Sequence, residues 1–191
     1  RQGDLTRVIV LAASRGSALG ELTQSRPKAM VEIHGQPLLG HIVSAYNGAG
    51  IKQITVVRGY LGDAIDLPGL TYVTNPEYAD TGELLSLACA LQADPDNSRD
   101  LFVSFGDVIF KKYVLDLLSE QDDDLVIAVD TEWKDSANRG RAADYVRCSE
   151  AHSRNDFYSR IILEQAAENI PENNIHGEWM GLLLVKAAGL P

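Results

Sequence analysis

Small residues follow the first apolar segment of the chain, and two cations lie among them or just behind them. Residues 7–11 (Arg-Val-Ile-Val-Leu) are mostly β-branched, which predicts a buried parallel strand. The small side chains of Ala13, Ser14, Gly16 and Ser17 would let backbone N–H groups come close to a polyanion. Arg15 offers a fork of donors and Lys28 a mobile point charge for phosphate oxygens. The segment therefore predicts a nucleotide-phosphate loop, although an ordinary strand-to-helix turn has a similar composition. It is neither a Walker loop nor a dinucleotide fingerprint, because Gly-Lys-Ser/Thr and the G-x-G-x-x-G spacing are both absent.

Two carboxylates follow apolar segments in the same way. Asp107 comes after residues 101–105 and Gly106, and Asp130 comes directly after residues 125–129. Ligands of an α/β sheet bind at the carboxyl ends of its strands, where a carboxylate can hold Mg²⁺ between nucleotide phosphates. We therefore take Asp107 and Asp130 as candidate metal ligands. A helix cap at Asp107 and a turn at Asp130 are the structural alternatives.

Helical and strand patterns alternate along most of the chain. Helices are predicted over residues 38–49, 82–92 and 108–119, and strands over residues 54–57, 70–73, 101–105, 125–129 and 179–185. This order predicts an α/β fold: a Rossmann-like three-layer αβα arrangement with a mostly parallel mixed sheet. Between residues 131 and 174 the signals weaken, and strands at 145–148 and 159–162 would form a small antiparallel flap.

Composition narrows the classes of protein that fit. The 191 residues suit a single domain spanning 1–191. A net charge of −10 argues against binding to nucleic acid or to an anionic membrane surface. We expect a cytoplasmic protein with reduced cysteines, because Cys89 and Cys148 lie far apart and neither a signal peptide nor a membrane-length apolar run is present. A start at Arg1 instead of Met is compatible with one domain of a longer protein.

Residues 8–39 resemble the amino-terminal signature of the sugar-nucleotide and related nucleotidyltransferases. Four pieces occur in the family's order and spacing: the strand from Val8, the loop Leu11-Ala12-Ala13 with Gly16 and Leu19, the pair Pro27-Lys28, and the turn Gly35-Gln36-Pro37-Leu38. The resemblance implies that Lys28 and Asp107 are catalytic, with Asp107 on Mg²⁺. It also implies that the nucleotide contacts Leu11, Ala12, Ala13, Ser14, Arg15, Gly16 and Ser17.

Two positions depart from that signature. Ser14 replaces the first loop glycine, and Ala18 stands where the family places an arginine for the β- and γ-phosphates. Either Arg15 or Arg26 supplies the missing charge, or the domain is catalytically weak.

A second set of residues is similar to the phosphocholine and phosphonate cytidylyltransferases. It comprises Asn75-Pro76, Tyr78-Ala79, Ser86-Leu87 and the late segment Gly177-Glu178-Trp179-Met180-Gly181. The similarity implies that Thr81, Gly82 and Ser86 face the pyrimidine, although a plain helix start with Asp80 or Thr81 as its cap also explains these residues. That branch includes cytidylyltransferase domains fused to phosphoenolpyruvate mutases, so the resemblance points to a fusion partner of that kind.

The acceptor site is the least defined part of the chain. Arg58 and Glu178 are candidates for it, and Glu178 is also an alternative second metal ligand. In the segment that the resemblance does not cover, Lys134, Arg139 and Arg141 would pair with an acceptor phosphonate, and Trp133 with Tyr145 would enclose a quaternary ammonium. A charged surface loop explains the same residues.

Together these features predict a Mg²⁺-dependent nucleotidyltransferase. It would move CMP from CTP to a small phosphonate or phosphate acceptor and release pyrophosphate. A sugar-1-phosphate nucleotidyltransferase using UTP, dTTP or GTP is the enzymatic alternative. A non-catalytic nucleotide-binding regulatory domain is the alternative that the missing arginine at Ala18 suggests.

Overall fold

The structure of the protein is a computed structural model that describes residues 6–135, 143–155 and 159–189. The chain divides into two compact units, one formed by Arg1–Val126 with Leu182–Pro191 and the other by Ile127–Gly181. Strands β7 (Leu125–Asp130) and β10 (Gly177–Val185) each contribute residues to both units. The expectation of one domain over residues 1–191 stays a prediction.

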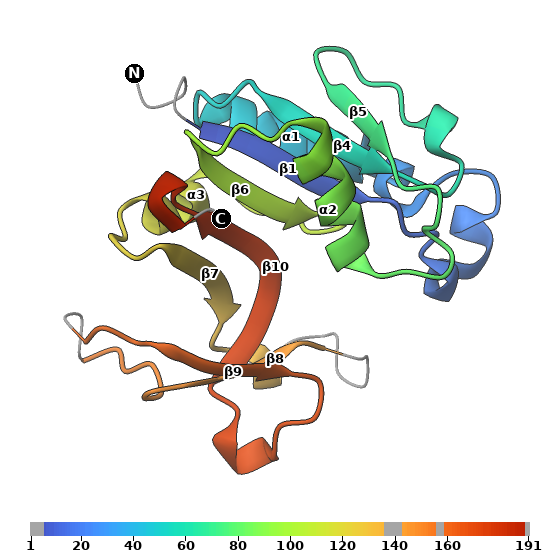
Figure 1. Ribbon diagram of the computed structural model, residues 1–191. Helices are drawn as coiled ribbons and strands as arrows, with labels where there is room; N and C mark the ends of the chain where they lie inside the picture. Colours follow the sequence, from blue (N-terminus) through green and yellow to red (C-terminus); the bar gives the residue numbers. More distant parts are fainter. Residues whose placement is uncertain (1–5, 136–142, 156–158, 190–191) are drawn as a thin grey trace. The chain divides into compact units, whose positions relative to one another are not determined.

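The first unit is built on a sheet with β1 (Thr6–Ala12) in its interior. β1 runs parallel to β4 (Ile54–Arg58) on one side and to β6 (Asp100–Phe105) on the other, and β5 (Thr71–Thr74) continues the parallel sheet beyond β4. The end of β10, Leu182–Val185, is antiparallel to β6 and makes the sheet mixed. Every residue of β1 is buried, because neighbouring strands cover both of its edges and helices cover both faces (Figure 1).

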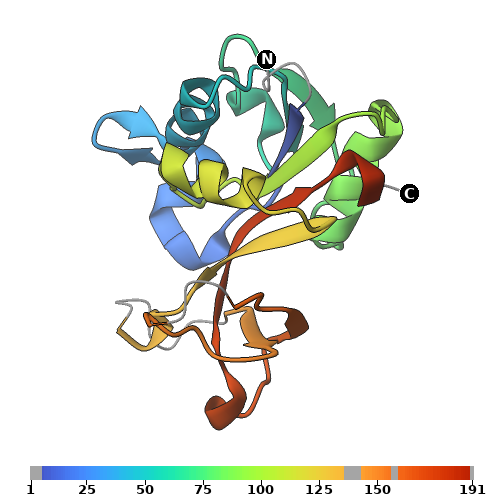
Figure 2. The ribbon, with the colours of Figure 1, turned by 90° about the vertical axis from the view of Figure 1, so that its left-hand side faces the viewer.

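Helices lie on both faces of this sheet. α2 (Glu83–Ala93) covers one face, and α1 (Leu38–Gly48) and α3 (Lys112–Ser119) cover the other (Figures 1 and 2). On the α2 face, Ile9 and Leu11 belong to an apolar cluster with Ala90. On the opposite face the ring of Tyr46 packs against Phe102 at 5.9 Å and against Phe110 at 5.3 Å between centroids. The predicted Rossmann-like three-layer fold with a mostly parallel mixed sheet is therefore confirmed.

One local expectation in the first unit needs correction, and one small element was not anticipated. α3 begins at Lys112 and not at residue 108, since Lys111 is extended (φ −96°, ψ 156°) and the side chain of Phe110 is buried against Tyr46. A small antiparallel sheet, β2 (Glu32–Ile33) with β3 (Gln36–Pro37), occupies a stretch for which no strands were predicted. Its turn is formed by His34 and Gly35, both at positive φ.

The second unit contains the antiparallel flap. β8 (Tyr145–Cys148) has the predicted bounds and pairs with β9 (Leu163–Ala167) and with Gly177–Glu178 of β10. The strand expected at residues 159–162 lies instead at Leu163–Ala167, so its predicted position is wrong. β9 is almost fully exposed, so it lacks the apolar alternation by which a strand is recognised in a sequence. Cys148 is a free thiol, and its burial raises its pKa and favours the neutral form.

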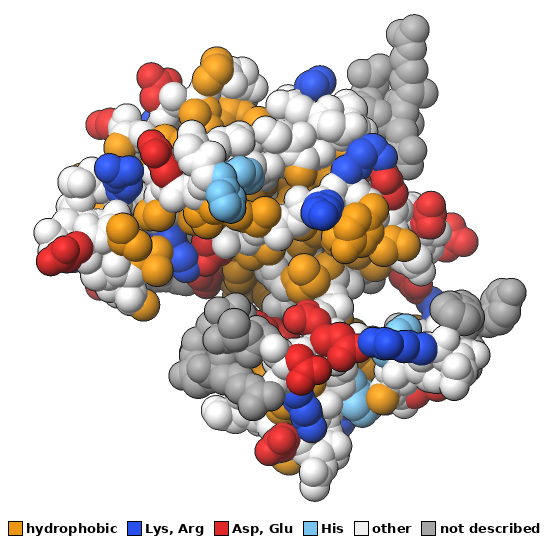
Figure 3. Space-filling view, turned by 180° about the vertical axis from the view of Figure 1, so that it is seen from behind, with side chains coloured by type: hydrophobic (Ala, Val, Ile, Leu, Met, Phe, Trp, Pro, Cys, Tyr) orange, Lys and Arg blue, Asp and Glu red, His pale blue; other side chains and the backbone are white. Residues whose placement is uncertain are grey.

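The distribution of charged side chains on the surface is consistent with the net charge of −10 (Figure 3). On the face shown in Figure 3, the described Lys and Arg side chains are scattered among acidic and apolar ones. None of the helices in the described ranges combines the length and the apolarity that a membrane crossing requires.

Candidate functional site

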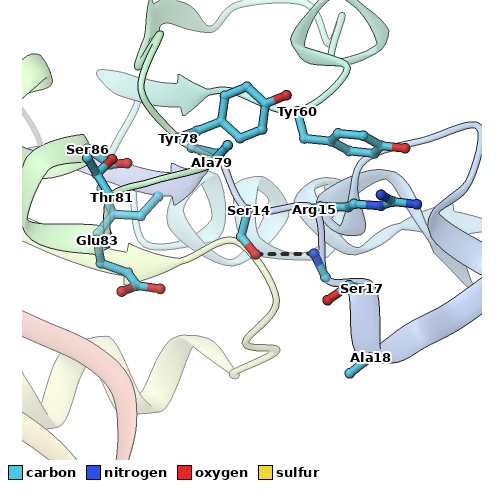
Figure 4. Close-up of a pocket in the computed structure, with 14 residues that line it drawn as sticks. Ser14, Arg15, Ser17, Ala18, Tyr60, Tyr78, Ala79, Thr81, Glu83 and Ser86 are labelled. Atoms are coloured by element: carbon cyan, nitrogen blue, oxygen red, sulfur yellow. Dashed lines mark hydrogen bonds between the residues drawn. The ribbon is translucent and has the colours of Figure 1, made fainter.

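A pocket of about 570 Å³ lies in the first unit, where β1, β4 and β5 end. Its walls come from the loop after β1, from Tyr60 after β4, and from the segment between β5 and the first turns of α2 (Figure 4). The lining residues are Leu11, Ala13, Ser14, Arg15, Gly16, Ser17, Ala18, Tyr60, Tyr78, Ala79, Thr81, Gly82, Glu83 and Ser86. The carboxyl ends of parallel strands are the expected place for a ligand in this class of sheet.

The loop after β1 has a defined shape. Gly16 is in the left-handed region (φ 68°, ψ 47°) and precedes a 3₁₀ helix, Ser17–Thr23. The hydroxyl of Ser14 accepts a hydrogen bond from the Gly16 N–H at 3.2 Å (Figure 4), and Thr23 Oγ1 donates to the Gly16 carbonyl at 3.2 Å. Serine at position 14 thus stabilises the turn through its side chain, which a glycine there would not do.

Lys28 and Asp107 form an ion pair beside this loop. They are 79 residues apart in the sequence, and their side chains are 32% and 31% exposed. The stem of Lys28 crosses Gly16 so closely that a Cβ at position 16 would lie 2.7–2.9 Å from its Cβ, Cγ and Cδ atoms. Gly16 therefore allows both the turn and the approach of Lys28.

The contact between Gly16 and Lys28 is testable by substitution. Gly16→Ala is expected to destabilise the fold by about 1–2 kcal/mol through backbone strain. Because the sequence predicts a catalytic role for Lys28 and the substitution would move its side chain, we also expect kcat to fall by about tenfold or more. Gly50→Ala is the matched control, since Gly50 also has positive φ (84°) but nothing lies within 4 Å of its would-be Cβ. Equal kcat values for the two variants, measured beside their thermal unfolding, would show that the position of Lys28 does not depend on Gly16.

Arg15 is held at the wall of the pocket by Tyr60. Its guanidinium lies over the Tyr60 ring at 5.1 Å from the centroid (Figure 4). Tyr60 is itself fixed to the loop, because its N–H donates to the Ala13 carbonyl at 3.0 Å and its hydroxyl donates to the Gln24 carbonyl at 3.1 Å. Arg15 is the cation among the residues that line the pocket.

Thr81 and Ser86 form the opposite side of the pocket (Figure 4). Both hydroxyls accept hydrogen bonds from the side-chain amide of Asn75, at 3.2 Å and 3.0 Å. Asn75 directly follows β5 and is fully buried. The pocket thus has a cationic side at Arg15, and an opposite side with the Thr81 and Ser86 hydroxyls and the Glu83 carboxylate (Figure 4).

The predicted nucleotide-binding residues all line this pocket except Ala12. Ala12 is 5% exposed and its Cβ lies 2.9 Å from the position that a Gly106 Cβ would take, so its side chain packs between strands. Arg58 is not among the lining residues either. Its guanidinium lies 4.5 Å from the centroid of the Tyr72 ring and donates to the Gly62 carbonyl at 3.4 Å. Its role at the acceptor stays a prediction.

The remaining candidates belong to the second unit. Oδ1 of Asp130 accepts from the Glu132 N–H at 2.9 Å, as in the turn that was the alternative for this residue. Glu178 lies in β10 opposite Tyr145 of β8. Their roles as metal or acceptor ligands stay predictions.

The two aromatic candidates of the second unit are in contact. The rings of Trp133 and Tyr145 are 5.1 Å apart, and the ammonium of Lys134 lies 5.3 Å from the Trp133 ring centroid. Arg139 and Arg141 lie outside the described residues.

The sequence did not single out Tyr60, Asn75 or Glu83 as site residues. Tyr60 and Asn75 each lie within two residues of a strand end, which is the signal that could have found them. Gly59 is also needed, because a Cβ there would lie 2.6 Å from Tyr78 Cβ and 2.7 Å from the Ala13 carbonyl oxygen. Within the described ranges, no group of three or more His, Cys, Asp and Glu side chains is placed to hold a metal ion.

Known proteins share this sequence pattern. The chain is 35% identical over 121 residues to CMP-5'-(3-aminopropyl)phosphonate synthase of Streptomyces rubellomurinus, an alignment that covers 59% of this chain and 19% of that protein. It is 30% identical over 135 residues to CTP:phosphoglutamine cytidylyltransferase of Campylobacter jejuni, with 65% of this chain and 53% of that protein covered. The chain therefore matches from about a fifth to about half of the length of these relatives.

The fold is also that of a solved structure. The inositol-1-phosphate CTP transferase from T. maritima superimposes with a TM-score of 0.73 at 20% identity, over 98% of this chain and 73% of that one. Residues 8–167 match the family described as the MobA-like NTP transferase domain. They include β1 and the loop after it, Lys28, Asp107 and the pocket. The chain therefore belongs to the MobA-like NTP transferase domain family of nucleotidyltransferases.

Proposed function

We propose that this domain transfers CMP from CTP to a small phosphonate or phosphate-ester acceptor and releases pyrophosphate. The observation that carries the proposal is a single pocket with a glycine-containing loop and Arg15 on one side and the Thr81 and Ser86 hydroxyls on the other. The relatives from S. rubellomurinus and C. jejuni are named for CMP and CTP chemistry and for acceptors with a phosphonate or phosphate group. These names favour cytidine over other nucleotides.

The chemistry needs alignment and charge neutralisation more than proton transfer. An ionised oxygen of the acceptor forms a bond to the α-phosphorus, and the bond from that phosphorus to the β-phosphate oxygen breaks. Its electron pair leaves with pyrophosphate. Because the attacking oxygen is already an anion, no general base is required. Lys28, next to the loop, would neutralise charge that develops at the α-phosphoryl oxygens.

Asp107 is the residue that we propose for Mg²⁺. Its carboxylate follows β6, is partly exposed and offers the oxygen ligand that Mg²⁺ prefers. Mg²⁺ sites commonly combine one or two carboxylates with substrate phosphates and water, so a lone carboxylate beside a triphosphate fits the ion. When bound there, the ion would neutralise charge on the phosphates. Lys28 now pairs with Asp107, and its ammonium group would then be free to interact with the nucleotide.

Arg15 is expected to compensate for the alanine at position 18. A triphosphate carries about four charges, of which Mg²⁺ offsets two and Lys28 one, so one further cation is needed. Arg15→Ala should weaken CTP binding by about tenfold or more, the size of a lost charge-assisted hydrogen bond. It should weaken CMP binding far less, because CMP lacks the β- and γ-phosphates.

Calorimetric titration of both nucleotides measures this difference. Arg26→Ala is the comparison variant, since Arg26 is exposed, does not line the pocket and is the rival source of the charge. Equal losses for CTP and CMP in Arg15→Ala, or a CTP-selective loss in Arg26→Ala instead, would refute the assignment to Arg15.

The proposed reaction is tested by pyrophosphate release from a panel of substrates. CTP, UTP, dTTP and GTP are each combined with small phosphonates, phosphocholine and glucose 1-phosphate, with Mg²⁺ and with EDTA. We expect turnover with CTP and a phosphonate or phosphate ester, abolished by EDTA and restored by Mg²⁺. Turnover with UTP, dTTP or GTP and the sugar phosphate would establish the sugar-nucleotide alternative. Nucleotide binding without pyrophosphate release from any pair would establish the regulatory one.

A further inference from the structure

Asn75 has an almost complete set of hydrogen bonds in a fully buried position. Its Nδ2 donates to Thr81 Oγ1 at 3.2 Å and to Ser86 Oγ at 3.0 Å, which uses both amide hydrogens. Its Oδ1 accepts from the Glu77 N–H at 3.0 Å. This last bond determines the orientation of the amide. If the amide were flipped, its nitrogen would face the Glu77 N–H, and two donors would oppose each other. Asn75 is therefore a fixed donor to two hydroxyl groups of the pocket.

The hydroxyl groups of Thr81 and Ser86 differ in the hydrogen bonds that they can still form toward the pocket. The Thr81 hydroxyl donates its hydrogen to the Glu77 carbonyl at 2.7 Å, so toward the pocket it can only accept. The Ser86 hydroxyl accepts from Asn75, and within the described ranges its own hydrogen has no acceptor. Ser86 is 4% exposed and still lines the pocket. A buried hydroxyl hydrogen without an acceptor is costly, and a ligand in the pocket would supply one.

The place of this donor suggests which part of a nucleotide it meets. Arg15 and Ser17 lie on one side of the pocket, and Thr81 and Ser86 lie on the other (Figure 4). If the phosphates of a nucleotide lie at the cationic side, its base lies at the side of the hydroxyl groups. Pyrimidines present a carbonyl oxygen at C2, and cytosine adds an unprotonated ring nitrogen, so that both possible partners are hydrogen-bond acceptors.

We propose that Asn75 is a positioning residue for base recognition: its buried amide occupies the acceptor capacity of Ser86 and leaves the Ser86 O–H to donate to the base. The proposal rests on the proposed nucleotide function of this pocket. Asn75 does not touch the nucleotide. It acts through Ser86, which it turns into a donor.

The test uses two ligands, CTP and ribose 5-triphosphate, which has the same phosphates and no base. Asn75→Asp keeps the shape of the side chain, but a carboxylate only accepts, so Ser86 would donate to it instead of to the base. We expect the Kd for CTP to rise by about tenfold, the size of one hydrogen bond. We expect the Kd for ribose 5-triphosphate to stay within about twofold.

Two further variants separate positioning from general structural damage. Ser86→Ala removes the donor and should give the same ligand-selective loss. Because both substitutions remove the same hydrogen bond from Ser86 to the base, the double variant should bind CTP no more weakly than either single variant. Asn47→Asp makes the same chemical change at an exposed position of α1 and should alter neither affinity.

Several results would overturn the proposal. They are equal losses for both ligands in Asn75→Asp, additive losses in the double variant, and unchanged CTP affinity in Ser86→Ala. If Asn75→Asp does not fold, Ser86→Ala with the two ligands still decides whether the base is read there. If the unmodified protein binds another nucleoside triphosphate instead of CTP, the proposed base specificity fails. The same variants measured with that nucleotide then test Asn75 separately.

Discussion

Replacing Asp107 by asparagine is expected to lower kcat by about a thousandfold or more, the combined effect of a lost metal ligand and lost transition-state neutralisation. Asparagine keeps the size of the side chain but lacks the charge that would attract Mg²⁺ and that now pairs with Lys28. The side chain of Asp107 is 31% exposed, and breaking such a partly exposed ion pair costs about 1 kcal/mol of stability. The variant should therefore fold normally and fail in turnover. Steady-state pyrophosphate release over a range of Mg²⁺ concentrations, beside thermal unfolding, measures both effects.

Asp116→Asn is the matched control for this experiment. Asp116 also pairs with a lysine, Lys112, with 2.6 Å between Oδ2 and Nζ, but on the exposed surface of α3 and away from the pocket. Its replacement should leave kcat unchanged. Near-normal Mg²⁺-dependent turnover in Asp107→Asn would remove Asp107 from the metal role and leave it as the structural partner of Lys28.

The second large effect is expected at Lys28. Lys28→Ala should lower kcat by about a hundredfold to a thousandfold, with a much smaller change in the KM for CTP. The reason is that the ammonium charge matters most while the α-phosphorus is under attack, and less in the ground-state complex. Separate determination of kcat and KM under saturating Mg²⁺ tests this division.

Lys28→Met distinguishes the charge of Lys28 from its packing. Methionine retains most of the apolar stem that crosses Gly16 but has no ammonium group. If the charge is what matters, Lys28→Met and Lys28→Ala should lose kcat equally, and Lys112→Met should lose none. A large increase in KM with kcat unchanged would make Lys28 a plain binding residue. Recovery of kcat in Lys28→Met would assign the effect to packing.

The order of elements in the first unit was predictable because its signals are local. A run of β-branched residues such as 7–11 is recognisable without its neighbours, and β1 was expected within a residue at each end. The bounds of α1 and α2 were similarly close, since each has an apolar stripe and clear breakers near its ends. Failures occurred where context overrides pattern. β9 is exposed and lacks an alternating apolar pattern, and the segment before α3 is extended because Phe110 is buried in the core.

From the sequence alone the fold class was correctly predicted, whereas the phosphate-binding role of the loop after β1 and the roles of Lys28 and Asp107 stay predictions. These depend on residues adjacent in the chain or on positions just after a strand. Only the tertiary structure decided that Lys28 and Asp107 form an ion pair and that Ala12 is turned away from the pocket. It also showed that the side-chain amide of Asn75 donates a hydrogen bond to the hydroxyl of Ser86. Such contacts depend on the order of the strands in the sheet, on the direction of each side chain and on which hydrogen-bond donors and acceptors are already paired. These are properties of contacts between segments, which no local pattern of residue types records.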